Sequence, residues 1–153
     1  SEPILGVVHT PALGVTYYAA KGEGAFKEEN GNAQSITARH NLADTLEVVA
    51  SRSHAGAETQ ALLEKLARDY TVNLVSKGSA LKLCLIAEGA AHFYPRLGPT
   101  MEWDTAAAQC VAEQAGAVVT DIKGERLKYN KENLLNPFFV VNAVAGLEWQ
   151  KYL

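Results

Sequence analysis

The chain has 153 residues, of which 48% are hydrophobic and 20% are charged, the balance of one folded domain with a real core. Its net charge of -3 gives no basic field for sequence-independent binding, so nucleic acid polymers are not expected partners. No apolar run approaches the roughly 20 residues that span a bilayer, and we expect no transmembrane segment. Residues 1–3 lack the basic and apolar regions of a signal peptide, and we therefore expect a cytoplasmic protein.

Short β-rich runs dominate the first 45 residues. They cover residues 4–9, 15–20, 24–27 and 34–37. A breaker cluster with Pro11 and Gly14 separates the first two runs, and Asn30-Gly31, a strong tight-turn signal, separates the last two. These signals predict an antiparallel meander at the start of the chain.

From Leu46 onward, strands alternate with helices. The expected strands cover residues 46–50, 72–75, 91–94, 118–121 and 138–142. Helices are expected over 58–70, 79–88 and 105–115, the last of them closed by Gly116. One face of the first helix carries four apolar side chains, Leu62, Leu63, Leu66 and Tyr70. The alternation predicts an α/β unit in which helices flank a mixed sheet.

The cysteines and histidines show no metal-binding spacing. Cys84 and Cys110 both lie among apolar residues of expected helices, which favours two buried free thiols over a disulfide or a redox pair. His9, His40 and His92 have no helical histidine partner or neighbouring acid, so we interpret them as structural or surface residues.

A carboxylate stands at the start of a helix rich in small residues, in the sequence Trp103-Asp104-Thr105-Ala106. The simplest role of Asp104 is that of an N-cap, which accepts a hydrogen bond from an early helix amide. The same position suits a ligand of a divalent cation, with the helix amides and dipole facing a phosphate oxygen. The two roles are compatible, and the residues alone leave both open.

Two further segments carry groups that suit a phosphorylated ligand. Ser79 has the position of an N-cap, and Gly78 before it allows the backbone to approach a ligand closely. Lys82 falls about one turn into the same helix, where a solvated lysine is the alternative to a phosphate contact. Arg96 follows an expected strand and can bind phosphate in a bidentate manner, or lie on the surface. Residues 51–54 offer hydroxyls and a cation at a strand end, a weaker signal.

The segment from Trp103 to Gly116 resembles the signature W-D-x-A-A, followed by a helix that ends in A-G, of the inositol monophosphatase superfamily of metal-dependent phosphomonoesterases. Segments 49–54, 78–85, 87–91, 94–96 and 135–137 resemble its bacterial 3'(2'),5'-bisphosphate nucleotidase branch. The resemblance covers essentially the whole chain. It implies the carboxyl-terminal half of an αβαβα sandwich, in which residues 1–45 are strands of a first domain and residues 46–153 form the α/β domain with the substrate and metal site.

That resemblance also implies an activity. The enzyme would be a Mg2+-dependent phosphoric monoester hydrolase of sulfur assimilation that converts adenosine 3',5'-bisphosphate to AMP and phosphate. Asp104 would bind Mg2+ and help to position the substrate, while Gly78, Ser79, Lys82 and Arg96 would contact nucleotide or phosphate. Inositol-specific relatives tend to carry an acid at the position of Arg96, so an arginine there favours a second phosphate.

The sequence also departs from the family pattern. A glutamate motif and a D-P-x-D-G-T motif supply most metal ligands and the water-activating group in the family, and neither occurs in these 153 residues. We therefore expect no catalytic residue here, an incomplete Mg2+ site, and little activity of the chain alone. We also expect an uncovered sheet edge and apolar face, to be covered by a complementing amino-terminal half or by a second copy in a homo-oligomer.

Two alternatives remain. The chain could be a non-catalytic truncated module that oligomerises and weakly binds phosphate or nucleotide. It could also be part of a phosphatase of the same superfamily that acts on inositol or sugar phosphates.

Overall fold

The computed structural model describes residues 1–50, 56–76 and 81–153. Its elements, in chain order, are β1 (Leu5–Thr10), β2 (Val15–Ala20), β3 (Gly24–Glu29), β4 (Asn32–Ile36), β5 (Thr45–Val49), α1 (Ala57–Leu66), β6 (Thr71–Val75), α2 (Lys82–Ala87), β7 (Phe93–Arg96), α3 (Glu102–Gln114), β8 (Val118–Asp121), β9 (Phe139–Asn142) and the 3-10 helix η2 (Trp149–Tyr152). The predicted strands and helices are all present within the described residues, with shifted ends. No helix among these residues is long and apolar enough to cross a membrane.

The first four strands form the predicted antiparallel meander, in the order β1-β2-β3-β4. Asn30 and Gly31 connect β3 to β4 with positive φ angles of 53° and 77°, as a tight hairpin turn of two left-handed residues requires. Tyr17, Ala19 and Ala25 are buried on one face of β2 and β3, whereas β4 is exposed at all but its last residue. On the other face, Leu5 and Val7 remain 68% and 56% exposed, and Tyr18, the cross-strand partner of Val7, lies beside them.

The other five strands form the predicted mixed sheet, in the order β6-β5-β7-β9-β8. β5 runs parallel to β6 and β7, whereas β9 runs antiparallel to β7 and β8. The carboxyl ends of β5 and β7 therefore lie at the same edge of the sheet, which is where ligands bind in many open α/β sheets.

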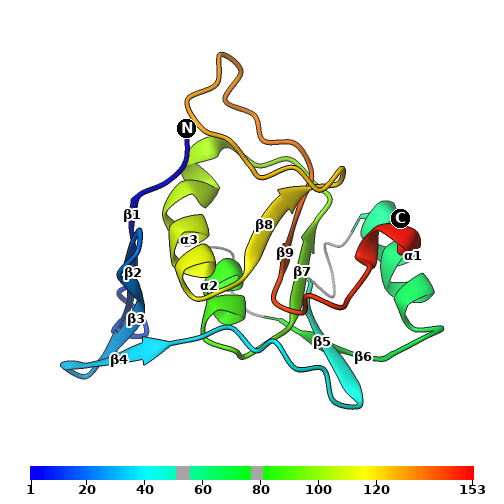
Figure 1. The fold of residues 1–153 in the computed structure, drawn as a ribbon, viewed down its shortest axis with the longest axis horizontal. Helices are drawn as coiled ribbons and strands as arrows, with labels where there is room; N and C mark the ends of the chain where they lie inside the picture. Colours follow the sequence, from blue (N-terminus) through cyan, green and yellow to red (C-terminus); the bar gives the residue numbers. More distant parts are fainter. Residues whose placement is uncertain (51–55, 77–80) are drawn as a thin grey trace.

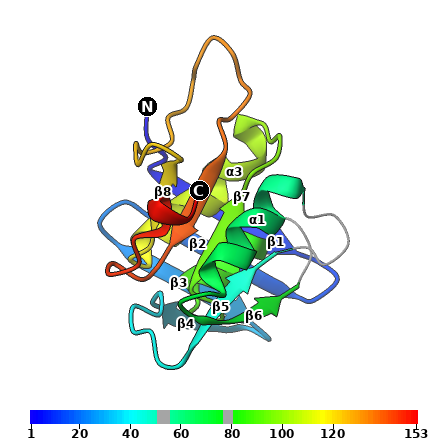
Figure 2. The ribbon, with the colours of Figure 1, turned by 90° about the vertical axis from the view of Figure 1, so that its right-hand side faces the viewer.

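Helices separate and cover the two sheets. α2 and α3 lie between the meander and the mixed sheet (Figure 1), and α1 and η2 pack on the opposite side of the mixed sheet (Figure 2). Tyr17 of β2, Val111 of α3 and Phe139 of β9 belong to one apolar core that spans both sheets. Cys84 and Cys110 lie buried in the same core as free thiols, as predicted. The division of the chain near residue 45 into two domain portions remains a prediction.

The main corrections concern helix ends. α3 begins at Glu102 rather than at Thr105, so it is one turn longer at its start than predicted. α1 ends at Leu66 instead of Tyr70. Tyr70 lies beyond the helix and packs edge-on against Tyr152 of η2, with ring centroids 6.3 Å apart. Lys82 is the first residue of α2 as the structure describes it, and the predicted start of this helix, at residue 79, lies outside the described residues.

Candidate functional site

Two cavities share a wall at the edge of the mixed sheet where β5 and β7 end. The first, of about 270 Å³, is lined by Ala50, Gly56, Thr59, Lys82, Tyr94, Pro95, Arg96, Leu97, Gly98 and Pro99. The second, of about 330 Å³, is lined by Lys82, Leu83, Tyr94, Arg96, Pro99, Thr100, Trp103, Asp104, Thr105 and Phe139. The first cavity thus lies beside the start of α1, and the second beside the first turn of α3. Lys82, Tyr94, Arg96 and Pro99 belong to both.

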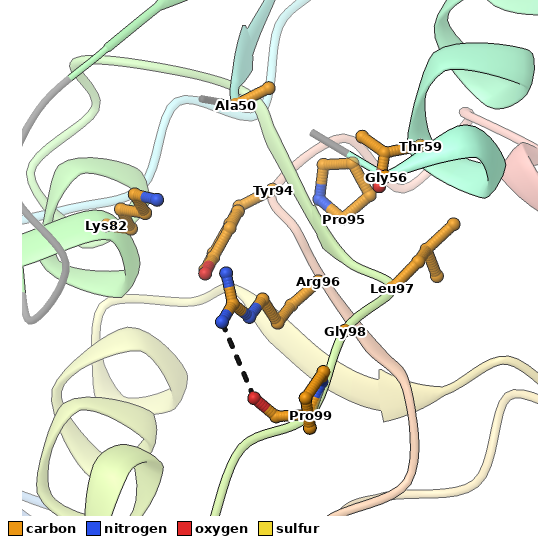
Figure 3. A pocket seen from close by; sticks show the side chains of 10 residues that line it. All are labelled: Ala50, Gly56, Thr59, Lys82, Tyr94, Pro95, Arg96, Leu97, Gly98 and Pro99. Atoms are coloured by element: carbon orange, nitrogen blue, oxygen red, sulfur yellow. Dashed lines mark hydrogen bonds between the residues drawn. The ribbon is translucent and has the colours of Figure 1, made fainter. Parts of the chain in front are cut away.

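The shared wall carries two cations around one aromatic ring. Tyr94 and Arg96 alternate along β7 and therefore point to the same face of the sheet. Nζ of Lys82 lies 5.8 Å from the centroid of the Tyr94 ring, within range of a cation–π contact. In Figure 3, the Tyr94 hydroxyl and the Arg96 guanidinium lie next to each other, with Lys82 reaching toward them from α2. Burial and, secondarily, the charge of Arg96 lower the pKa of Lys82, whereas burial raises the pKa of Tyr94.

Arg96 keeps donors available. Its Nη2 donates one long hydrogen bond of 3.5 Å to the carbonyl oxygen of Pro99. Its Nε is buried and has no partner within the described part of the chain. Neither Arg96 nor Lys82 forms an ion pair with a carboxylate among residues 1–50, 56–76 and 81–153. Two unneutralised cations in one partly enclosed space favour an anionic ligand there.

Asp104 is not the N-cap of α3, which corrects the simplest sequence interpretation. Met101 caps the helix, and Asp104 is its third residue. Oδ2 of Asp104 accepts a 2.8 Å hydrogen bond from the N–H of Met101, which is the reach-back bond of a capping box. The carboxylate thus stabilises the first turn of the helix from its third position. It is also exposed and lines the second cavity. Within the described residues, Oδ1 of Asp104 has no hydrogen-bond donor and remains available to a ligand.

A buried polar cluster supports the first turn of α3. Thr105 is only 2% exposed, and its hydroxyl accepts hydrogen bonds from Tyr129 at 2.9 Å and from the side-chain amide of Asn136 at 3.0 Å. Glu102 binds the backbone N–H groups of Asn130 and Lys131 at 2.8 and 3.1 Å. The loop between β8 and β9 is thereby fixed to the helix that carries Asp104.

The structure brings three of the five predicted site residues together. Lys82, Arg96 and Asp104 all line the second cavity. Gly78 and Ser79, and also residues 51–54, lie outside the described residues. Sequence reasoning gave no role to Tyr94 or Asn136. Tyr94 could have been found, because it lies two residues before Arg96 on a predicted strand and therefore shares its face. For Asn136, the only signal was its place in the segment 135–137.

The donors beside the second cavity meet only part of what Mg2+ requires. Among the described residues, no three histidine, cysteine, aspartate or glutamate side chains cluster as a metal site. Mg2+ usually keeps several waters and is held by one or two carboxylates together with substrate phosphates. Asp104 with the cavity beside it fits one such shared ion, but it does not fit two or three ions held by these residues alone. Two of the histidines contact the backbone: Nδ1 of His40 lies 2.8 Å from the carbonyl oxygen of Ala143, and Nδ1 of His92 lies 3.0 Å from the backbone nitrogen of Glu47.

Comparisons with known proteins agree with this architecture. A family model described as "Inositol monophosphatase family" matches residues 1–143. The 3'(2'),5'-bisphosphate nucleotidase CysQ of Escherichia coli is 49% identical over 142 residues, which cover 92% of this chain and 55% of the relative. The protein of the same name from Haemophilus influenzae is 34% identical, with coverage of 98% and 56%. The chain therefore spans about half the length of the curated relatives it matches.

Solved structures show the same fold. The crystal structure of CysQ from Bacteroides thetaiotaomicron, described as a bacterial member of the inositol monophosphatase family, superposes with a TM-score of 0.80 at 38% identity and covers 92% of this chain and 58% of that one. An inositol monophosphatase from Zymomonas mobilis superposes with a TM-score of 0.76 at 19% identity, covering 99% of this chain and 57% of that one, which supports the fold alone.

Proposed function

Since the chain belongs to the inositol monophosphatase family, we propose that its 153 residues form the substrate-binding part of a phosphomonoesterase whose substrate is a nucleotide with two phosphates. The observation that carries this proposal is the convergence of Lys82, Arg96 and Asp104 on one cavity from three separate elements. Two cations and a carboxylate with a free oxygen suit a phosphate group that is bound together with a divalent cation.

The two-cavity arrangement supports a bisphosphate over a monophosphate. Lys82 and Arg96 stand in the wall between the cavities, so a ligand that extends from one cavity into the other would have phosphate within reach of both cations. An arginine presents a planar fork that binds phosphate in a bidentate manner. The curated relatives at 34–49% identity are named 3'(2'),5'-bisphosphate nucleotidases, which supports adenosine 3',5'-bisphosphate as the substrate and AMP and phosphate as the products.

We propose that Asp104 supplies one ligand of Mg2+, and that polypeptide outside these 153 residues supplies the other ligands and the group that activates water. When bound, Mg2+ would neutralise charge on the phosphate and lower the pKa of a coordinated water. Within the chain, Asp104 would orient that ion relative to Lys82 and Arg96, which would hold the phosphate. By this proposal the chain alone has little or no activity.

The outer face of the meander supports the need for a partner. Leu5 and Val7 are exposed there beside Tyr18 and Phe26, whose rings stack at 5.3 Å. Exposed apolar clusters of this kind commonly mark an interaction surface. We propose that complementing polypeptide of the same family, or a second copy of this chain, covers this face. Sedimentation of the chain with and without the complementing part would measure which partner binds; a strictly monomeric chain in both samples would contradict the proposal.

The test is phosphate release from adenosine 3',5'-bisphosphate with Mg2+. It is measured for the chain alone, and for the chain mixed with the part of the Escherichia coli relative that lies outside the matched region. We expect turnover only in the mixture. Asp104→Asn should abolish it, whereas Asp44→Asn, which alters an exposed carboxylate in the loop before β5, should leave it unchanged.

The same assay separates the alternatives. Turnover of inositol phosphate in preference to the bisphosphate would replace the proposed substrate. If the mixture forms a complex but releases no phosphate, the non-catalytic alternative is favoured. Turnover by the chain alone that Asp104→Asn abolishes would show that the remaining metal ligands are recruited across an oligomer.

A further inference from the structure

A short segment between β8 and β9 runs along the start of α3. Residues 134–136 pair with residues 100–102 in antiparallel fashion, through an isolated bridge between Met101 and Leu135. The N–H of Glu102 donates to the carbonyl oxygen of Leu134 at 2.9 Å, and the N–H of Asn136 donates to that of Thr100 at 2.9 Å. The first turn of α3 therefore has a backbone partner outside the helix.

The side chain of Asn136 reaches under this turn. Asn136 is 4% exposed, and its Nδ2 donates to the carbonyl oxygen of Met101 at 3.0 Å, to Oγ1 of Thr105 at 3.0 Å and to Oγ1 of Thr100 at 3.3 Å. The Met101 carbonyl can only accept, so a flipped amide would place Oδ1 against it. The amide must therefore be oriented with Nδ2 toward α3. In this orientation Oδ1 is buried and has no hydrogen-bond partner in the described part of the chain.

Met101 links this amide to the carboxylate of the site. Its carbonyl oxygen accepts from Asn136, and its N–H donates to Oδ2 of Asp104 at 2.8 Å. Asn136 also bonds the hydroxyl of Thr105, the residue after Asp104. Met101, which anchors the carboxylate, and Thr105, which follows Asp104, are thus both bonded to one buried amide.

We propose that Asn136 is a positioning residue that holds Asp104, through Met101 and Thr105, in the orientation that leaves Oδ1 available for a divalent cation; this inference rests on the proposed function of Asp104. Partners that orient a metal ligand commonly change metal affinity by about 10- to 100-fold when they are removed. Loss of the Asn136 amide would remove its bonds to the Met101 carbonyl and the Thr105 hydroxyl. The first turn of α3 would then be held by backbone bonds alone, and the orientation of the Asp104 carboxylate would loosen.

The experiment uses NMR of the chain saturated with adenosine 3',5'-bisphosphate, because the fit described above requires substrate phosphates beside Asp104. The probe is Mn2+, which prefers oxygen ligands as Mg2+ does and broadens nearby amide signals. In Asn136→Ala, we expect Mn2+ affinity, measured by broadening at residues 104–105, to fall by about tenfold or more. Hydrogen exchange at the Met101 amide should rise, while the buried amide of Val140 in β9 stays protected. The control is Asn133→Ala, because Asn133 is exposed and bonds only within the same segment, to the N–H of Leu135 at 3.1 Å; it should change neither quantity.

Each outcome decides the proposal. Unchanged Met101 exchange, or unchanged Mn2+ broadening in Asn136→Ala when Asp104→Asn abolishes it, would overturn the positioning role. Should Asp104→Asn leave the broadening intact, the proposed metal role of Asp104 is wrong, and positioning of a metal ligand is overturned with it. If Asn136→Ala does not fold, the native chain gives the answer: the side-chain amide protons of Asn136 should exchange slowly, and exchange at the rate of a free amide would contradict the three hydrogen bonds.

Discussion

Gly6 of β1 touches the backbone of Ala107 in α3. A Cβ added at Gly6 would overlap the Ala107 carbonyl oxygen and lie 2.9 Å from Cβ of Cys110. The meander therefore packs on α3 with only hydrogen between one strand and the helix. This close approach also explains why α3 carries small residues on that side.

Gly6→Ala should destabilise the fold for this reason. Rigid backbone on both elements must separate to admit the methyl group, and overpacking of this kind costs about 1–3 kcal/mol. Urea unfolding would measure the loss. Gly146→Ala is the matched control, since a Cβ there meets nothing within 4 Å. Equal stability of Gly6→Ala and the native chain would show that the contact between β1 and α3 is looser than described.

The sequence was sufficient for the strands but not for the first turn of α3. Tight-turn residues such as Asn30 and Gly31 act locally, so the meander could be predicted from them. Asp104 was expected at the cap because aspartate favours that position. Aspartate also serves at the third helical position when its carboxylate reaches back to the cap backbone, and a sequence does not distinguish the two positions without the partner atom. The acids at positions 102 and 104 together were a signal that the helix starts earlier.

The site itself could be predicted only in part. Lys82, Arg96 and Asp104 carry charges that suggest phosphate chemistry wherever they lie. Their convergence depends on how α2, β7 and α3 pack, which no local pattern specifies. The role of Asn136 could not be predicted either, because its three hydrogen-bond acceptors lie 31 to 36 residues away in the chain.

Tyr17→Phe tests the link between the meander and α2. The Tyr17 hydroxyl donates to Oε1 of Glu88 at 2.8 Å, while Nζ of Lys27 binds Oε2 of Glu88 at 2.7 Å. The Tyr17 side chain is buried, so its hydroxyl depends on Glu88 as a hydrogen-bond partner. A hydrogen bond to a charged group contributes about 1.5–3 kcal/mol to the free energy of unfolding. We expect a loss of stability of that order in denaturant unfolding. Tyr18→Phe should cost less, because Tyr18 contributes a stacked ring and its hydroxyl bonds no described residue; equal losses would contradict the role of Glu88.

His92 should make stability depend on pH. Burial and then the charge of Arg39 lower its pKa below 6.5, outweighing the contacts with Asn41 and Glu47 that act in the opposite direction. Nδ1 of His92 accepts a 3.0 Å hydrogen bond from the N–H of Glu47, so the neutral ring fits the fold. Below about pH 6.5, His92 is protonated in the unfolded chain but remains mostly neutral in the folded chain. Protonation therefore favours the unfolded chain, and stability falls.

The free energy of unfolding should therefore be flat above about pH 7 and decline at lower pH, with a slope from this residue of at most about 1.4 kcal/mol per pH unit. Urea titrations between about pH 8 and about pH 5.5 would measure it. His92→Asn should have a shallower slope in that window, whatever its stability at high pH. An unaltered slope would exclude His92 as the source.

Lys82 should set the upper pH limit of ligand binding. Burial and the nearby charge of Arg96 lower its pKa below 10.5, so the ammonium becomes neutral at a lower pH than a solvated lysine does. Affinity for adenosine 3',5'-bisphosphate should accordingly fall as the solution becomes alkaline, before pH 10.5 is reached. Loss of a hydrogen bond to a charged group corresponds to about tenfold weaker binding or more, and calorimetric titration at several pH values would measure it.

Lys82→Arg is the matched variant for this test, because a guanidinium remains protonated throughout the alkaline range. Its affinity for adenosine 3',5'-bisphosphate should stay constant over the alkaline range in which the native chain loses binding. This holds even if the longer arginine side chain weakens binding at neutral pH. Parallel loss in both proteins would assign the alkaline limit to another group. Lys82→Met should bind weakly at every pH, which separates the loss of the charge from a general effect of alkali on the fold.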